Sequence, residues 1–294
     1  MLVQDLKDRV AVVTGAGGGM GRSIVLSLAA QGTHVVVSDI EGSAAEAVRG
    51  EALALGVRAI AHATDVSKLE QVKALADAAY EAFGKVDILV NNAGVTMRPF
   101  RATWDTAYED FKWLIDVNIW GVVHGIHVFV PRMRQQPGEK HIVNTSSMGT
   151  LALVPGHSTY VMTKEAVNGL SNVIREELRD DGFGVTILYP GYVTTRIATS
   201  ERLRPENERS DKRKVIPYDT YVKAKPGNVE QTAVSGGTVT MQDAGTMSVG
   251  LEPDAVGPMV VEAIRRNMPH LTTHPAPEVA IRKHADALMN AYLG

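Results

Sequence analysis

A glycine-rich turn directly after an apolar run is the feature that most constrains the fold of this chain. The run is Val10-Ala11-Val12-Val13, and the turn follows as Thr14-Gly15-Ala16-Gly17-Gly18-Gly19-Met20-Gly21. This order predicts a strand that turns sharply into a helix, whose N-terminal N–H groups and dipole face an anion such as a pyrophosphate. Glycine clusters also make ordinary loops, so the turn alone leaves both interpretations open. Its candidate ligand-binding residues are Gly15, Gly19, Met20 and Gly21.

The rest of the chain alternates short β-branched runs with longer segments of helical spacing. Helical segments end at glycine, as at Gly32 after residues 24–31 and at Gly84 after residues 70–83. This alternation predicts an α/β fold with a single doubly wound parallel sheet, the Rossmann fold, covered by helices on both faces. We expect one domain over residues 1–294. The expected strands are Val10–Val13, His34–Ser38, Ala59–Ala63, Val86–Val90, His141–Asn144 and Val185–Leu188.

Charge, cysteine content and apolar runs limit the kinds of molecule that this chain is expected to bind. The formal charge of −3 and the pI near 6.3 give no electrostatic reason to bind nucleic acid or an anionic membrane surface. The chain has no cysteine, which excludes disulfides and thiolate metal sites, and two nearby histidines, His124 and His127, lack carboxylate partners. The N-terminus lacks the apolar core of a signal peptide, and no run approaches the roughly 18 apolar residues that span a bilayer. We therefore expect a cytoplasmic protein with a small-molecule substrate and no metal.

Polar residues follow the second and third expected strands. Asp39 ends the second strand at a distance from Gly21 typical of a carboxylate that reaches the adenosine ribose of a dinucleotide. A carboxylate there repels a 2′-phosphate, which favours NAD over NADP. The alternative is a surface aspartate that caps a helix. Asp65 ends the third strand, where it either accepts a hydrogen bond from adenine or caps the following helix. Their neighbours Ile40 and Val66 complete this group of cofactor-binding candidates.

The fourth strand runs into Asn91-Asn92-Ala93-Gly94. Two carboxamides at a strand end can brace the neighbouring strands, and the glycine lets a ribose pass close to the backbone. A plain turn is the alternative, since asparagine and glycine are common turn residues. Asn92, Ala93 and Gly94 join the cofactor-binding candidates.

Tyr160 and Lys164 stand four residues apart, which places the phenol and the ammonium on one face of a helix. A tyrosine with an ordinary pKa near 10 is a poor base, but a neighbouring cation favours the phenolate and lowers that pKa. Ser147 follows the fifth strand, where its hydroxyl can bond the same substrate oxygen. A helix-surface pair is the alternative, and the combination with the glycine turn, Asp39 and Ser147 is what favours an oxidoreductase site.

These motifs together resemble the classical short-chain dehydrogenase/reductase family. The family's markers, Thr-Gly-x₃-Gly-x-Gly, Asn-Asn-Ala-Gly, Ser, Tyr-x₃-Lys and Pro-Gly, stand here in order over residues 5–197. The resemblance implies that Tyr160 transfers the proton and that Ser147 orients the substrate oxygen. It also implies that Lys164 binds the nicotinamide ribose and lowers the tyrosine pKa, and that Asn118 holds a proton-relay water.

The same resemblance extends to the segment after the sixth strand. Pro190-Gly191-Tyr192-Val193-Thr194-Thr195 matches the family's region that grips the nicotinamide carboxamide, with Val193 acting through its backbone and Thr195 through its side chain. Pro190 and Gly191 complete the cofactor-binding candidates.

Two segments depart from the family pattern. Residues 271–275 replace the family's usual seventh-strand motif, and a helical tail continues to Gly294, which favours a homodimer through the helices of Asn118 and Tyr160 over the usual tetramer. Residues 196–250 are long and mix charges of both signs. They stand where the family places its substrate lid, so we expect an enlarged lid over a bulky substrate. A solvated surface excursion is the alternative.

Segments such as Gly250-Leu251-Glu252-Pro253 are similar to a bacterial subgroup that includes Cα-dehydrogenases of lignin-derived aryl ethers. This implies NAD-dependent oxidation of a bulky, aryl or benzylic secondary alcohol. A hydroxysteroid or cyclic-ketone dehydrogenase is the alternative. A non-catalytic dinucleotide sensor is the other class, which the presence of tyrosine, lysine, serine and asparagine disfavours. The substrate-pocket candidates are Thr96, Arg98, Leu151, Leu153, His157 and Tyr192.

Overall fold

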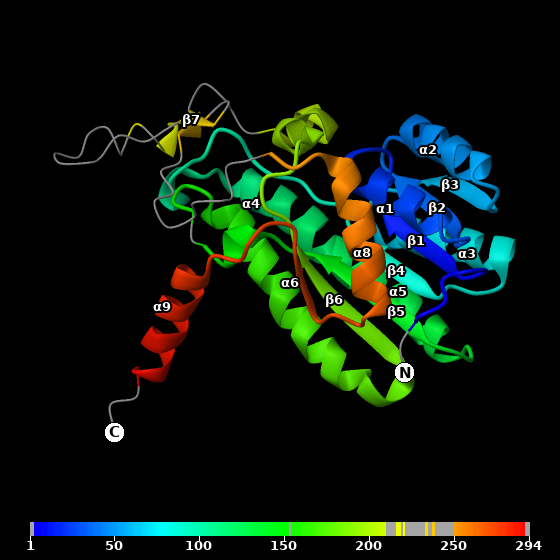
Figure 1. Cartoon of the computed structure of the whole chain (residues 1–294). Helices are drawn as coiled ribbons and strands as arrows, with labels where there is room; N and C mark the ends of the chain where they lie inside the picture. The colour runs from blue at the N-terminus through cyan, green and yellow to red at the C-terminus, as the bar shows by residue number, and fades with distance from the viewer. Residues whose placement is uncertain are drawn as a thin grey trace.

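The computed structural model describes residues 3–152, 154–209, 216–218, 220, 233–234, 237–238 and 250–291. Its seven-stranded parallel sheet has the order β3-β2-β1-β4-β5-β6-β9 (Figure 1). The strands are β1 (Val10–Thr14), β2 (His34–Asp39), β3 (Ala59–Ala63), β4 (Ile88–Asn91), β5 (Lys140–Thr145), β6 (Phe183–Tyr189) and β9 (His270–Thr272); β7 (Ala233–Val234) and β8 (Gly237–Thr238) form a separate antiparallel pair. The predicted doubly wound α/β fold is confirmed.

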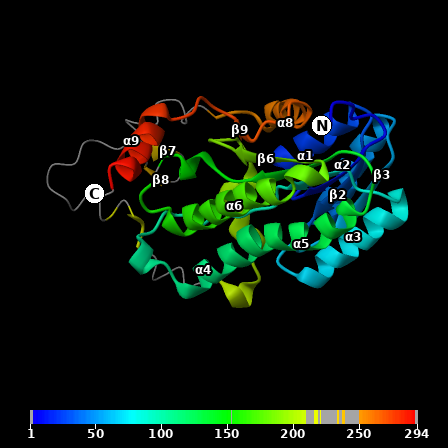
Figure 2. The same cartoon turned by 90° about the horizontal axis from the view of Figure 1, so that it is seen from below.

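Helices cover both faces of this sheet (Figure 2). α1 (Gly19–Ala29), α2 (Gly42–Ala54) and α8 (Val256–Arg265) share one apolar core with the sheet, and α3 (Leu69–Phe83), α5 (Gly121–Arg134) and α6 (Ser158–Glu177) share the other. The central strands are buried on both faces, which is why they read as continuous apolar runs. Order reverses between β1 and β4, so the carboxyl ends of these strands open a crevice for a ligand.

Two expectations about element ends differ from the structure. Gly84 ends α3 in the left-handed conformation at φ +74°, as predicted, but α1 ends at Ala29 and Gly32, at φ +80°, turns the chain three residues later. Residues 270–272 form a seventh strand against β6 although the family's sequence motif is absent there. The pairing needs only backbone groups and a buried Leu271, which the replacement sequence still supplies.

A continuous helical segment runs from α4 (Tyr108–Ile115) through a π-helical turn, η2 (Asp116–Trp120), into α5. Its length and its mean hydropathy of 1.4 over the most apolar window would let it cross a membrane, which the sequence runs had not indicated. This is weak evidence, because a core helix passes the same test, and 44% of that window is buried inside the protein. The tail forms the predicted helix, α9 (Glu278–Met289), which buries none of its residues.

Candidate active site

The glycine-rich turn has the shape of an anion cradle. Gly15 and Gly19 have φ of +62° and +54°, which side chains rarely allow, and Gly18 precedes the first turn of α1 without a capping side chain. A Cβ on Gly21 would lie 2.1 Å from the Gly15 carbonyl oxygen, so only glycine permits this close packing. The free N–H groups at the start of α1 therefore fit a dinucleotide pyrophosphate.

Asp39 lies beside this cradle at the end of β2. Its carboxylate accepts hydrogen bonds from the Gly17 N–H at 2.8 Å and the Glu41 N–H at 2.9 Å, so it is tied to the glycine turn and does not cap α2 with its side chain. Ile40 is 45% exposed at the mouth of the same cleft. A carboxylate held here suits the hydroxyls of an adenosine ribose.

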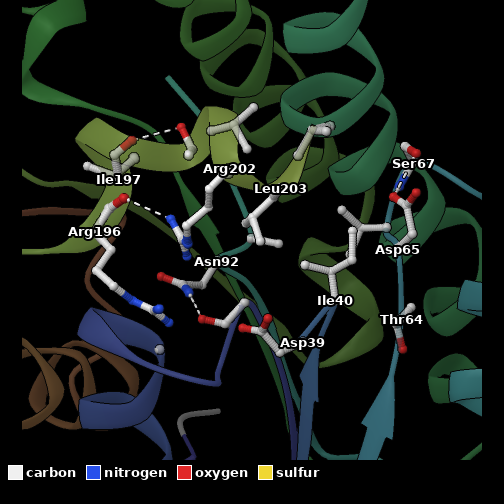
Figure 3. A pocket seen from close by; sticks show the side chains of 18 of the residues that line it. Asp39, Ile40, Thr64, Asp65, Ser67, Asn92, Arg196, Ile197, Arg202 and Leu203 are labelled. Atoms are coloured by element: carbon white, nitrogen blue, oxygen red, sulfur yellow. Dashed lines mark hydrogen bonds between the residues drawn. The ribbon is translucent and has the colours of Figure 1, made fainter. Parts of the chain in front are cut away.

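The next strand end closes the adenine side of the cleft. Asp65 accepts hydrogen bonds from the Ser67 N–H and hydroxyl at 2.9 and 2.7 Å, while Lys68 is the N-cap residue of α3. Asp65 therefore stabilises its own turn, and its helix-cap interpretation is wrong. Val66 is buried and lines the cleft next to it, and Figure 3 shows Asp65 and Ile40 on this side of the cleft.

The asparagines after β4 brace the sheet, as expected. The Asn91 amide donates to the Asn144 carbonyl oxygen of β5 at 2.8 Å, and the Asn92 amide donates to the backbone carbonyls of Thr14 and Gly15, both at 3.0 Å. A Cβ on Gly94 would lie 3.3 Å from Asn118 Oδ1 and from Lys164 Nζ. The backbone at Ala93 and Gly94 thus lines the cleft between the cradle and the reaction centre.

The loop after β6 meets the cradle from the other side. Pro190 accepts a hydrogen bond from Met148 N–H, and the Gly191 N–H donates to the Thr273 hydroxyl. Val193 pairs with Leu251 in a parallel bridge, in which the Thr194 N–H donates to the Leu251 carbonyl and the Leu251 N–H donates to the Tyr192 carbonyl. The N–H and C=O of Val193 itself therefore point to the opposite side. Thr195 Cγ2 would be 3.0 Å from a Cβ on Gly19, and its side chain caps the following helix.

Asn118 lies in the π-helical turn η2 and is fully buried. Its oxygen accepts from the Val95 N–H at 2.9 Å, and its amide donates to the Val95 carbonyl and the Thr163 hydroxyl, both at 3.0 Å. The extra residue of a π turn rotates this side chain out of the regular helical register, a feature frequent at functional sites. Asn118 thereby joins the loop after β4 to α6.

Ser147, Tyr160 and Lys164 converge at the carboxyl end of β5. The Ser147 hydroxyl hydrogen-bonds the Tyr160 phenol, and the Lys164 ammonium donates to the Thr145 carbonyl at 2.9 Å and lies 5.7 Å from the centre of the tyrosine ring. Both side chains are almost fully buried. The predicted spacing on one helix face is therefore observed.

The expected effect of Lys164 on the tyrosine is wrong for this state of the chain. Burial raises the pKa of Tyr160 to about 12, and the groups that act against this rise are the Ser147 hydroxyl and the charge of Arg98. Burial also lowers the pKa of Lys164 to about 8. Burial of the phenol, which the spacing of the two residues does not report, decides the direction of the shift in the Tyr160 pKa.

Four of the substrate-pocket candidates gather around Tyr160. The His157 ring stacks on the tyrosine ring at 4.5 Å and hydrogen-bonds the Thr96 hydroxyl at 2.9 Å. The charge of Arg98 acts on Tyr160 and Tyr192. Leu151 packs against Met148 in the neighbouring apolar cluster. Leu153 lies outside the described residues.

The start of the predicted lid lies over the cofactor cleft. Residues of η5 (Arg196–Leu203) and η6 (Glu206–Glu208) line it together with Asp39 and Asn92. Figure 3 shows Arg196 and Arg202 reaching into the cleft, and both guanidinium groups pair with Glu41 at 3.2 and 3.0 Å. These three residues were missed because Arg196 and Arg202 stand in a mixed-charge segment and Glu41 stands in the turn after the second strand, and nothing in the sequence indicates that they meet. Further along, the Tyr218 N–H donates to the Phe100 carbonyl at 2.7 Å, and most of residues 210–249 lie outside the described part of the chain.

A buried ion cluster anchors the end of η5. Asp110 of α4 accepts hydrogen bonds from Arg204 at 2.5 Å and from Arg101, and Arg204 also lies over the Trp113 ring. Arg101 and Arg204 are each 1% exposed and Asp110 is 0% exposed. The cluster ties the segment that covers the cleft to α4.

Comparison with known proteins agrees with this geometry. The family model described as short chain dehydrogenase matches residues 9–206. A cyclohexanol dehydrogenase from Acinetobacter sp. is 37% identical over 188 residues, 64% of this chain and 74% of that protein. The structure of a short chain dehydrogenase/reductase from Burkholderia phymatum in complex with NAD is 34% identical, covers 97% of this chain and 95% of its own, and has a TM-score of 0.83.

A further structure, the apo form of LigD from Sphingobium sp. strain SYK-6, is 24% identical with a TM-score of 0.75 over 99% of this chain and 100% of its own. This likeness shows the fold alone. The family match, the dinucleotide cradle and the Ser–Tyr–Lys constellation agree with one another. The chain belongs to the short chain dehydrogenase family and is an alcohol oxidoreductase that uses a nicotinamide dinucleotide.

Proposed function

We propose that the enzyme transfers a hydride between NAD and a bulky secondary alcohol or the corresponding ketone, with Tyr160 as the general acid and base. The observation that carries this proposal is the convergence of Ser147, Tyr160 and Lys164 beside the cleft that the glycine cradle opens. A bound nicotinamide ring supplies the hydride acceptor or donor. The chain itself supplies the proton and the orientation of the substrate oxygen.

The side chains divide this work. Ser147 and Tyr160 share a hydrogen bond, so a substrate oxygen that replaces it meets two hydroxyls at once. With a pKa raised by burial, the phenol keeps its proton at neutral pH and is ready to donate to a carbonyl oxygen. In the oxidative direction the same oxygen receives the alcohol proton, and Lys164 and Arg98 provide the positive charge that stabilises the phenolate. Asn118 fixes the loop at Val95 against α6.

NAD is the proposed cofactor in preference to NADP. Asp39 presents a carboxylate beside Gly17, and Glu41 adds a second acidic group near the mouth of the cleft. A 2′-phosphate beside Asp39 would face like charge, which costs several kcal/mol and predicts a preference for NAD of roughly a hundredfold. The dissociation constants of NADH and NADPH, measured by their fluorescence, test this preference, and equal constants would contradict it.

The proposed substrate is an aryl, benzylic or alicyclic secondary alcohol. The alicyclic choice is supported by the cyclohexanol dehydrogenase relative, and the aryl choice by the sequence similarity of the second half of the chain to aryl-ether Cα-dehydrogenases. The first experiment follows NADH absorbance with 1-phenylethanol, cyclohexanol and a hydroxysteroid. Turnover that Tyr160→Phe reduces by about 10²- to 10⁴-fold, with NADH affinity unchanged, is the expected result. Full activity of this variant would refute the assignment of Tyr160.

We also propose that the enzyme is a cytoplasmic homodimer through α5 and α6. Trp120 of η2, directly before α5, and Met162 and Val173 of α6 are 48%, 42% and 58% exposed, and large exposed apolar side chains favour association. Light scattering should give twice the monomer mass, and Val173→Glu should shift the protein toward monomer. A monomer at micromolar concentration would contradict this.

A further inference from the structure

Arg98 is joined to the catalytic tyrosine by a stack of aromatic rings. Its guanidinium carbon lies 4.1 Å from the centre of the Phe100 ring. Phe100 and His157 have ring centres 4.5 Å apart, and His157 stacks on Tyr160 at 4.5 Å with the ring planes 7° apart. A cation from the loop after β4 is thus held in a fixed position relative to the phenol on α6.

This cation has no counter-ion among the residues that the structure describes. The other arginines of this region, Arg101 and Arg204, share Asp110, and Arg196 and Arg202 share Glu41. Among the described residues, Arg98 interacts with the Phe100 ring, with the two phenols Tyr160 and Tyr192 and, through its charge, with His157. It is partly buried, and burial lowers its pKa, so the charge is held here at a cost that no carboxylate of the described residues offsets.

The charge of Arg98 reaches the reaction centre, where the Lys164 ammonium is the other cation beside the tyrosine ring. Arg98 lowers the pKa of Tyr160 and of His157, and it is the only described cation that acts on either side chain in this way. Burial together with Arg98 lowers the pKa of His157 to about 3, so the imidazole is neutral at physiological pH and adds no second charge. Arg98 is therefore the one cation of this stack among the described residues, and one positive charge matches a ligand group with one negative charge.

We propose that Arg98 binds a carboxylate of the substrate, so that the enzyme acts on a cyclic or aryl hydroxy acid and its oxo acid. The proposal rests on the proposed function and names the class of its substrate. A guanidinium presents two parallel N–H groups that fit a carboxylate, whereas a phosphate would call for a second cation, and the described residues of this stack provide none. The rings of Phe100 and His157 separate Arg98 from the phenol. The substrate carboxylate is therefore not attached to the reacting carbon but to another carbon of the substrate ring.

The test compares two compounds of equal shape that differ in charge. cis-3-Hydroxycyclohexanecarboxylate and its carboxamide are oxidised with NAD by the wild-type enzyme, by Arg98→Met, by Arg98→Lys and by the distant surface control Arg282→Met. We expect the wild type to prefer the acid by about ten- to a hundredfold in kcat/KM, as for a charge-assisted hydrogen bond. Arg98→Met should abolish the preference mainly through KM, Arg98→Lys should keep part of it, and Arg282→Met should keep all of it.

A second measurement needs no turnover. Binding of cyclohexanecarboxylate and cyclohexanecarboxamide to the enzyme–NADH complex is followed by NADH fluorescence. Tighter binding of the carboxylate that is lost in Arg98→Met supports the inference even if neither alcohol is oxidised, in which case the proposed reaction is what fails. Equal use of acid and amide by the wild type, equal or absent binding of the two probes, or an equal loss of both activities in Arg98→Met overturns the inference and leaves the alcohol chemistry standing.

Discussion

The buried cluster of Arg101, Asp110 and Arg204 gives the sharpest prediction of stability. Asp110 is the carboxylate between two arginines that are each 1% exposed, and among the described residues the further carboxylate that pairs with this cluster is Glu201, 3.6 Å from Arg204. Asp110→Asn keeps the shape of the side chain and removes its charge. Two buried guanidinium groups are then left without their shared anion.

The size of the effect follows from this burial. Breaking a buried ion pair on one side costs about 3–5 kcal/mol, because the remaining charge stays desolvated. The amide oxygen still accepts one hydrogen bond, so we expect the lower end of the range, about 3 kcal/mol. For a chain of this size that lowers the Tm by roughly 6–12 °C. Since Arg204 ends the segment that carries Arg196 and Arg202, NADH affinity should fall as well.

Urea unfolding and calorimetry measure the first effect, and NADH fluorescence measures the second. The matched control is Asp77→Asn, which removes a 75% exposed aspartate from its pair with Arg132 and should cost less than about 1 kcal/mol. The triple variant Arg101→Met, Asp110→Leu, Arg204→Met removes every charge at once and should be much closer to wild type than Asp110→Asn. If Asp110→Asn unfolds within 1 kcal/mol of wild type, the reasoning from desolvated charge is wrong.

Two further predictions concern the charges of the cofactor cleft and the reaction centre. Glu41→Gln should tighten NADH binding by about two- to fivefold at low salt, because Arg196 and Arg202 lose their counter-ion and face the pyrophosphate. The control Glu46→Gln, on α2, should leave the NADH affinity unchanged. Weaker NADH binding by Glu41→Gln would contradict this reasoning. Burial lowers the pKa of Lys164 from 10.5 to about 8, so below pH 8 the lysine is charged in both states and its full penalty, about 3 kcal/mol, opposes folding. Between pH 8 and 10.5 only the folded state releases the proton, so the free energy of unfolding should rise with pH relative to Lys164→Met, and a constant difference in urea titrations would refute it.

The sequence predicted local geometry well where it depends on residues close together in the chain, and the catalytic and cofactor-binding roles of these residues stay predictions. The glycine turn, the polar residues after each strand and the Tyr160–Lys164 spacing each report on one turn or one helix face, and the parallel sheet brings all strand ends to one edge. The subgroup, the lid over the substrate and the dimer remain predictions. Val193 was identified through the resemblance, and its backbone direction came only from the bridge to Leu251.

The rest depended on tertiary burial, which no local pattern reports. Arg204 looks like one more charge in a solvated segment, yet it is buried against Asp110, ninety-four residues earlier in the chain. A lowered pKa of Tyr160 was predicted from its spacing to Lys164, and burial of the phenol raises this pKa instead. Arg98 was identified only as a pocket candidate, because its lack of a counter-ion becomes visible when the described side chains around it are known.

Burial explains why a site that disfavours the charged forms of its own residues is still useful. A phenol whose pKa is about 12 holds its proton at neutral pH, and an ammonium whose pKa is about 8 keeps its proton there with a smaller margin than an ordinary lysine. Charge that arrives with the ligands acts in this dry environment far more strongly than it would in water. Ligand charge can therefore change the protonation of Tyr160 where solvent cannot. On the proposed function, a substrate carboxylate on Arg98 would neutralise the one cation that now lowers the tyrosine pKa, which favours the protonated phenol and the reduction of an oxo acid.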